Sequence, residues 1–147
     1  GYNNCILEFN DCRLHKSQIL GELHKGFEVA NEWPGATRLQ VASTCLGRAE
    51  RAMEHAKQYA VDRHQFGQQI GKFQGVSFKL ADMAMELKAA ELLTLEAAWK
   101  FDQKTVTDMD MAMAKLKATE VLAFIADEAI QIHGGMGFTW EIDCHFP

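Results

Sequence analysis

The residues best suited to chemistry lie in one loop, residues 62–74, between two long helical patterns. Arg63 supplies a permanent charge and a planar fork that suits phosphate or carboxylate. Phe66 offers a flat apolar face for stacking, and Gly67 and Gly71 let the backbone turn sharply. A cation after a helix is also favoured by the helix dipole, but that explains Arg63 alone. The whole loop suits an anionic, aromatic molecule such as a nucleotide.

A second candidate segment runs from Gln131 to Gly137 and contains three glycines. Gly134 can end a helix by adopting a positive φ, and the other glycines can simply make a tight turn. One glycine is enough for a helix cap, however. Successive glycines have no Cβ, so they let the backbone approach a ligand and point N–H groups at it. We interpret His133, within this segment, as a solvated or core-edge histidine, because nothing near it indicates a metal site.

A third segment, Thr37–Arg38, opens the first helical pattern and by itself is explained as a helix N-cap followed by a surface arginine. The three segments together, in this order and spacing, resemble the C-terminal half of the flavin-dependent acyl-CoA dehydrogenases. The resemblance covers nearly the whole chain. It implies an FAD site, and the cofactor-binding residues expected from it are Arg63, Gln65, Phe66, Gln74, Gln131, Gly134 and Gly135.

The resemblance also implies how these residues are used. Arg63 is expected on the flavin pyrophosphate and Phe66 against the adenine end, with the glycine segment over the adenosine portion. In the family that flavin belongs to the neighbouring subunit, which implies a homodimer or homotetramer with shared cofactor sites. Arg38 is the candidate for a contact with the acyl-CoA substrate.

The reaction implied is the oxidation of an acyl-CoA thioester to the 2,3-enoyl-CoA, with an electron-transfer flavoprotein as the electron acceptor. In some relatives the catalytic base is a Glu at the position of Thr37, and a threonine cannot take a proton from carbon at neutral pH. In others the base is a Glu in a motif that this sequence does not reach. Glu141 and Asp143 are not assigned that role. We therefore expect no catalytic base in this chain, and no activity from the chain alone.

Two alternatives stay open. The first is a helical oligomerisation module that keeps the fold and has lost catalysis, although Arg63, Phe66 and the paired glycines are not needed for that. The second is a flavin-dependent acyl-CoA oxidase or reductase of the same superfamily. No residue in the sequence separates this second alternative from the dehydrogenase.

Composition limits the other classes. A net charge of -5 argues against a nucleic-acid surface, which needs clustered Lys and Arg. No apolar run approaches the ~20 residues that cross a bilayer, so no membrane partner is expected. The four cysteines lack metal-ligand spacing, so we expect free thiols and no metal. The chain does not begin with Met, which indicates a fragment; the resemblance implies a cytoplasmic location in a bacterium and the mitochondrial matrix in a eukaryote.

Three helical patterns must position these segments, at about residues 36–62, 73–102 and 108–132. The first has a stripe of mostly small residues, so we expect it to be packed closely on more than one side. The second has two apolar stripes, and a helix of that kind is either central in a bundle or covered by another subunit. Its second stripe is Phe78, Ala81, Met85, Leu92, Leu95 and Trp99.

The fold class predicted is therefore mainly α, an antiparallel helical bundle of the acyl-CoA dehydrogenase C-terminal type. Thr107 or Asp108 is expected to cap the third helix and Gly134 to end it. Residues 4–14 alternate imperfectly around the turn-prone Asn10–Asp11 and predict a short strand pair, or a poorly ordered tail. We expect residues 1–33 to be the end of a middle β-domain with its linker, and residues 34–147 to be the bundle, incomplete at its C-terminus.

Overall fold

The computed structural model describes residues 4–32, 34–139 and 141. The chain divides into two units, Gly1–Trp33 and Pro34–Pro147. The first unit has little regular structure in its described part. It contains a 3-10 turn, η1 (Lys16–Gln18), and one short helix, α1 (Gly26–Glu32).

The strand pair predicted over residues 4–14 is wrong, because none of these residues is in a strand. An isolated pair of strands is marginal in water. The apolar side chains of Ile6, Leu7 and Phe9 are 91%, 75% and 78% exposed, so they find no sheet to pack on within the described part of this unit. Only the bend at Asn10–Asp11 is present, with Asp11 at a φ of 49°.

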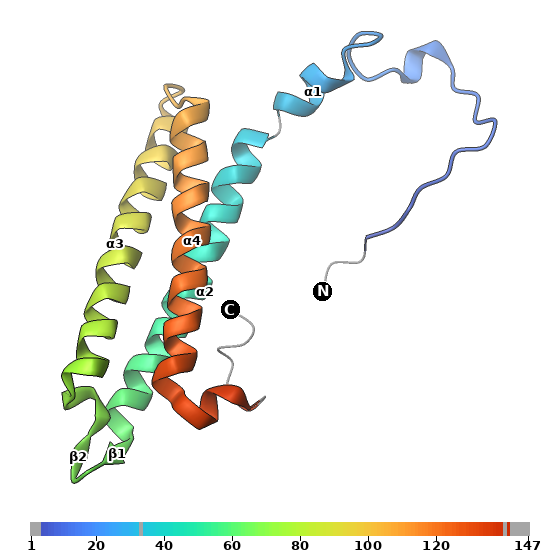
Figure 1. Ribbon diagram of the computed structural model, residues 1–147. Coiled ribbons are helices and arrows are strands. Elements are labelled where there is room, and N and C mark those ends of the chain that lie inside the picture. The colour runs from blue at the N-terminus through green and yellow to red at the C-terminus, as the bar shows by residue number, and fades with distance from the viewer. Residues whose placement is uncertain (1–3, 33, 140, 142–147) are drawn as a thin grey trace. The chain divides into compact units, whose positions relative to one another are not determined.

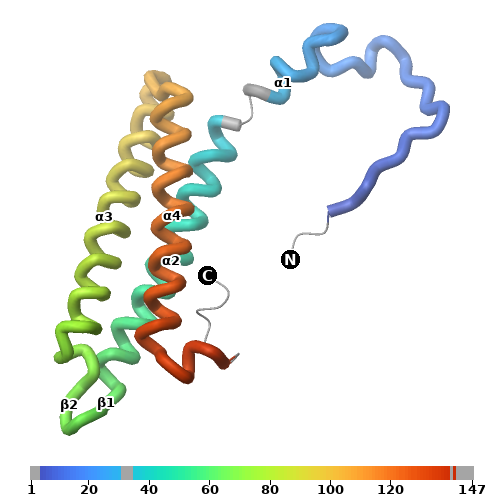
Figure 2. Tube along the Cα trace, in the orientation of Figure 1, coloured from blue at the N-terminus to red at the C-terminus, as the bar shows by residue number. Residues whose placement is uncertain are grey.

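The second unit is an antiparallel bundle of three long helices, as predicted (Figure 1). They are α2 (Pro34–Asp62), α3 (Gln74–Asp102) and α4 (Asp108–His133). A hairpin of strands β1 (His64–Gln65) and β2 (Gln68–Gln69) follows α2, and the 3-10 turn η2 (Ile70–Lys72) leads into α3. A second 3-10 turn, η3 (Gly134–Phe138), follows α4. Figure 2 shows that the hairpin and η3 lie at the same end of the bundle.

The core of the bundle is made mainly of alanines, which confirms the close packing expected from the small-residue stripe. Among the described residues only Met83 and Ile125 are large side chains that are fully buried. The alanines let the helix backbones approach closely, and the buried alanines that share the main cluster with these two are Ala49, Ala52, Ala56, Ala60, Ala90 and Ala129.

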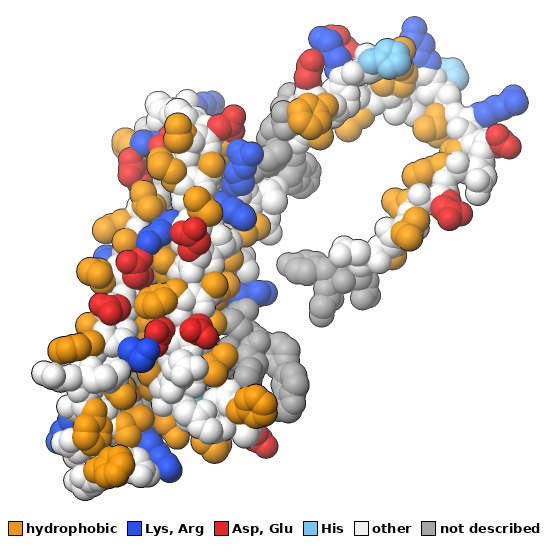
Figure 3. Space-filling model, viewed as in Figure 1, with side chains coloured by type: hydrophobic (Ala, Val, Ile, Leu, Met, Phe, Trp, Pro, Cys, Tyr) orange, Lys and Arg blue, Asp and Glu red, His pale blue; other side chains and the backbone are white. Residues whose placement is uncertain are grey.

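The second apolar stripe of α3 is exposed, so α3 is not central in this unit. Phe78, Met85 and Trp99 are 60%, 62% and 62% exposed, and Leu92 and Leu95 are similar. Figure 3 shows orange hydrophobic side chains, interspersed with charged and other ones, along the side of the bundle where α3 lies. Exposed large apolar side chains gathered along one helix are typical of an interaction site.

Ion pairs join α3 to α4. Lys79 pairs with Glu128, and Lys117 pairs with Glu86. Lys117 is therefore only partly exposed. No helix in the described part of the chain is both long enough and apolar enough to cross a bilayer.

The start of α4 is set by a capping box. The Thr107 hydroxyl accepts a hydrogen bond from the Asp110 backbone N–H at 3.2 Å, and the Asp110 carboxylate accepts from the Thr107 N–H at 2.9 Å. Asp110 also pairs with Lys100 of α3 at 2.8 Å. The Lys100 hydrogen bond first, and then those from Thr107, lower the pKa of Asp110 to about 2.

Asp110→Asn is expected to lower the melting temperature at neutral pH, with a difference that disappears in acid. A lowered carboxyl pKa contributes stability that is present above the ordinary value of 3.8 and is lost as pH falls towards about 2. Thermal unfolding measured from pH 7 to pH 2 checks this. Asp127→Asn, an exposed change of the same charge on α4, is the control. A gap between wild type and Asp110→Asn that stays constant down to pH 2 would contradict the expectation.

Candidate functional site

The hairpin after α2 presents an aromatic ring at its tip. His64 pairs with Gln69 and Gln65 with Gln68, which leaves Phe66 and Gly67 as a two-residue turn. Both turn residues have positive φ, 52° for Phe66 and 81° for Gly67, as a type I′ hairpin turn requires. The left-handed conformation costs a non-glycine residue about 1–2 kcal/mol. Phe66 therefore occupies a strained position.

Folding does not explain that strain. The Phe66 side chain is 93% exposed, and its ring contact is an edge-to-face one with Phe73 at a centroid distance of 6.2 Å. An asparagine or glycine would fit the turn better and would lose little burial. Strained residues of this kind cluster at ligand sites. The exposed and strained Phe66 ring is therefore a candidate for contact with a ligand.

Arg63 is fixed by its backbone, while its side chain makes no ion pair with another described residue. Its N–H donates to the Tyr59 carbonyl at 2.9 Å, and its carbonyl accepts from the Ile70 N–H at 2.9 Å. The neighbouring Asp62 accepts a hydrogen bond from Gln58 at 2.9 Å. Among the ion pairs of the described residues, none involves Arg63, so its exposed guanidinium can take an anionic ligand.

The three glycines after α4 are under different structural constraints. Gly134 has a φ of 58° and ends the helix, as predicted. A Cβ built on Gly137 would lie 2.4 Å from the Ile130 carbonyl oxygen, so Gly137 is needed for packing. A Cβ built on Gly135 meets nothing within 4 Å. Gly135 is exposed and has no steric reason to be glycine, so it offers bare backbone for a ligand to approach.

The structure brings seven of the eight predicted site residues to one end of the bundle. Gln74 is the first residue of α3 and Gln131 lies in the last turn of α4, and both are exposed. They flank the hairpin and the glycine turn at that end, which is the lower end in Figure 1. A charged fork, a displayed ring, bare backbone and amide side chains are groups that fit a dinucleotide. The residues at this end are Arg63, Gln65, Phe66, Gln74, Gln131, Gly134 and Gly135.

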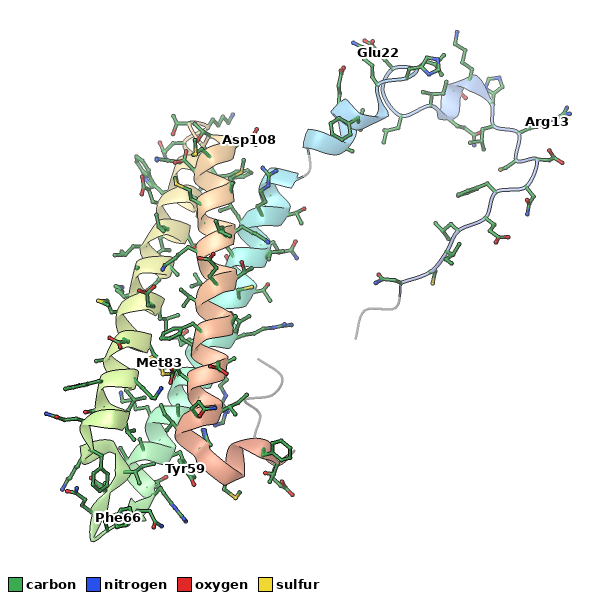
Figure 4. The ribbon with its side chains drawn as sticks, in the orientation of Figure 1. Arg13, Glu22, Tyr59, Phe66, Met83 and Asp108 are labelled. Carbon is green, nitrogen blue, oxygen red and sulfur yellow. The ribbon has the colours of Figure 1, made fainter. Side chains whose placement is uncertain are left out.

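Arg38 is the exception, because it lies near the other end of α2. At about 1.5 Å per residue, Arg38 and Arg63 are about 38 Å apart along the helix. Arg38 pairs with Asp108 at the start of α4, with Nη1 and Oδ1 3.2 Å apart. Figure 4 labels Asp108 and Phe66 at opposite ends of the bundle. One copy of this chain cannot place Arg38 and Arg63 on the same small part of a ligand.

Glu141 is not suited to act as a base toward a carbon acid. A hydrogen bond with the Thr139 side chain is the first cause that lowers the pKa of Glu141, which makes that carboxylate a weaker base. Asp143 lies outside the described residues. No group of three or more His, Cys, Asp or Glu within the described ranges is arranged to hold a metal ion.

His133 is a core-edge histidine, which confirms one of the two interpretations drawn from the sequence and excludes the solvated one. It is 5% exposed at the edge of the core, and its ring lies 4.5 Å from the ring of Tyr59, centroid to centroid. Sequence reasoning missed Tyr59 altogether. The available signal was position, because Tyr59 comes one helical turn before Arg63 and His133 comes immediately before Gly134.

Comparison with known proteins gives one consistent family. The family model described as "Acyl-CoA dehydrogenase, C-terminal domain" matches residues 24–145. The mitochondrial short-chain specific acyl-CoA dehydrogenase of Rattus norvegicus is 44% identical over 136 residues, 92% of this chain and 33% of that protein. The 3-(aryl)acrylate reductase of Clostridium sporogenes is also 44% identical, over 92% of this chain and 36% of that protein.

Further relatives and solved structures of the family carry other names. The CarC subunit of the caffeyl-CoA reductase-Etf complex of Acetobacterium woodii is 42% identical, over 89% of this chain and 35% of that protein. Among solved structures, butyryl-CoA dehydrogenase from Megasphaera elsdenii has a TM-score of 0.88 at 39% identity. PigA with FAD and proline has a TM-score of 0.89 at 31% identity. Both cover 93% of this chain and 36% of the other, so the chain spans about a third of the length of these relatives.

Proposed function

The chain belongs to the acyl-CoA dehydrogenase family through its match to that family's C-terminal domain, and from that premise we propose that the whole protein binds FAD and oxidises an acyl-CoA thioester to the 2,3-enoyl-CoA. The observation that carries the proposal is the convergence of Arg63, Phe66 and the Gly134–Gly135 turn at one end of the bundle. A scaffold needs neither a strained, exposed phenylalanine nor an exposed glycine without steric constraint at the same end of the bundle as an arginine that makes no ion pair within the described residues.

The residues of this chain hold the cofactor rather than perform the reaction. Arg63 pairs with the pyrophosphate, Phe66 stacks on the adenine, and the backbone at Gly134 and Gly135 lies against the adenosine portion. FAD, when bound, supplies the acceptor for the hydride that leaves the carbon β to the thioester carbonyl. The proton on the α carbon goes to a carboxylate base that lies outside the described residues.

Two copies of the chain are required if both ends of α2 serve one active site. Arg38, near the other end of the helix, is proposed for the CoA contact, and about 38 Å separates it from Arg63. The Arg63 end then binds the cofactor of a neighbouring copy. The exposed apolar stripe of α3 provides a surface that an oligomer would cover, which supports a homodimer or homotetramer.

Electron-transfer flavoprotein is the proposed electron acceptor, supported by the relative that is named as part of an Etf complex. The proposed location follows the source, the cytoplasm for a bacterium and the mitochondrial matrix for a eukaryote. Two of the relatives are named as reductases, so reduction of a 2,3-enoyl thioester or acrylate is a second candidate reaction on the same FAD site.

The test is to express the complete open reading frame and record the visible absorption before and after adding a saturated acyl-CoA under nitrogen. A yellow protein that bleaches supports the dehydrogenase. A yellow protein that stays yellow with saturated thioesters, but is reoxidised by an enoyl-CoA after chemical reduction, supports the reductase. A colourless protein that assembles and takes up no added FAD overturns both in favour of an oligomerisation module.

Phe66→Asn is expected to weaken FAD binding by the complete protein without lowering its stability. Asparagine tolerates positive φ, so the melting temperature without FAD is expected to match or exceed that of wild type. The dissociation constant for FAD is expected to rise by roughly tenfold, because stacking of one base on an aromatic ring is worth about 1–3 kcal/mol. Phe101→Asn, at the other end of α3, is the control and should leave FAD affinity unchanged. A large loss of stability with unchanged affinity would make Phe66 a structural residue.

A further inference from the structure

We propose that Tyr59 and His133 form a positioning pair that sets the spacing between the Arg63 loop and the Gly134–Gly135 turn, so that one dinucleotide can contact both. The inference rests on the proposed FAD site and adds two residues that do not themselves touch the cofactor. Their role is to hold the two binding segments, which come from different helices, at a fixed separation.

The pair is a direct contact between α2 and α4. The ring centroids are 4.5 Å apart and the ring planes are inclined by 32°, which is within the range of aromatic stacking contacts. Tyr59 is half-buried against the alanine core, and His133 is 5% exposed. Figure 4 labels Tyr59 near Phe66, at the end of the bundle that carries the candidate site.

His133 is held in one orientation. Its Nδ1 lies 2.7 Å from the Ala129 carbonyl oxygen, which can only accept, so Nδ1 carries the ring proton of this hydrogen bond. One edge of the ring is therefore tied to the last turn of α4, while its face lies against Tyr59. An aliphatic side chain would fill the same space without presenting a ring face to Tyr59.

Each ring is joined to one binding segment through the backbone. The Tyr59 carbonyl accepts the Arg63 N–H at 2.9 Å, so the Arg63 backbone follows the position of Tyr59. His133 is bonded directly to Gly134, and the turn after it folds back until a Cβ built on Gly137 would lie 3.2 Å from the His133 Cβ. A change in the ring contact therefore moves the Arg63 loop relative to the glycine turn.

The test measures FAD binding and thermal unfolding of the complete protein, with the flavin removed and added back. His133→Leu, which removes the ring, is expected to raise the dissociation constant for FAD by about tenfold, because neighbours that act together are coupled to this extent. His133→Phe keeps the ring and is expected to raise it by less than about threefold. Ile125→Val, a buried change in the middle of α4, is expected to lower the melting temperature and leave the dissociation constant unchanged.

A double-mutant cycle with Arg63→Ala distinguishes positioning from a general loss of stability. If His133 acts by placing Arg63, His133→Leu should change the dissociation constant by less than about threefold once Arg63 is alanine. Equal effects in both backgrounds, or an unchanged dissociation constant in the single variant, overturn the proposal. If His133→Leu does not fold, Tyr59→Leu removes the other ring and is read by the same criteria. A wild-type protein that binds no FAD overturns the proposed function itself, which is a different result from a binding protein that ignores these substitutions.

Discussion

Arg63→Ala is expected to yield complete protein that purifies largely without FAD, with a dissociation constant for added FAD raised roughly 10- to 100-fold. A hydrogen bond to a charged group is worth about 1.5–3 kcal/mol, and Arg63 is proposed to make more than one to the pyrophosphate. Stability without FAD should change little, because the guanidinium is exposed and makes no ion pair with any other described residue. The measurement is the flavin-to-protein absorbance ratio, followed by a titration with FAD.

Two further variants sharpen that result. Arg63→Lys keeps the charge and loses the planar fork, so an intermediate affinity is expected if the contact is bidentate. Arg51→Ala removes an exposed arginine from α2 that pairs only with Glu54 on the same helix, and it should leave FAD content unchanged. Flavin content in Arg63→Ala equal to that of wild type would remove Arg63 from the site.

Gly137→Ala is expected to have the largest effect on stability, a loss of about 2–3 kcal/mol. The added Cβ would lie 2.4 Å from the Ile130 carbonyl oxygen, far inside van der Waals contact, and a backbone group in the last turn of α4 cannot rotate away as a side chain can. Either η3 lifts off the helix or the last turn of α4 opens. Thermal and urea unfolding of the complete protein without FAD check the magnitude.

Gly135→Ala is the matched control, two residues away. Nothing lies within 4 Å of a Cβ built there, so stability is expected to stay within about 0.5 kcal/mol of wild type. FAD affinity should nevertheless fall, since the methyl group would stand between the backbone and the adenosine portion. If both alanine variants unfold alike, or if Gly135→Ala binds FAD normally, the separate roles of the two glycines are wrong.

The helix boundaries could be predicted from the sequence because local signals set them. Thr107 with Asp110 forms a capping box that depends on four consecutive residues, and Gly134 ends α4 through its own backbone freedom. The strand pair over residues 4–14 failed for the opposite reason. Strand pairing depends on neighbouring strands, and an alternating pattern does not reveal whether any are present.

The candidate site was predictable in its parts and not in its arrangement. Arg63 and Gly134 stood out by residue type, but their location at one end of the bundle depends on the antiparallel packing of α2 and α4. The separation of Arg38 from them likewise follows from helix length. The contact between Tyr59 and His133 joins residues 74 positions apart, and no periodicity within either helix indicates it. The apolar stripe of α3 is exposed in a single chain, and the sequence of one chain does not reveal what packs against it.

The alanine core has a consequence for how far the helices can slide. Met83 and Ile125 are the large side chains that are fully buried within the described residues, and they sit among alanines on the facing helices. If one helix shifted along its axis by one turn, one of these two side chains would collide with the backbone of the facing helix. Met83 and Ile125 therefore favour one axial register between the helices. Substitutions on the outer faces of the helices can accumulate without changing the axial register between the end of α2 and the end of α4.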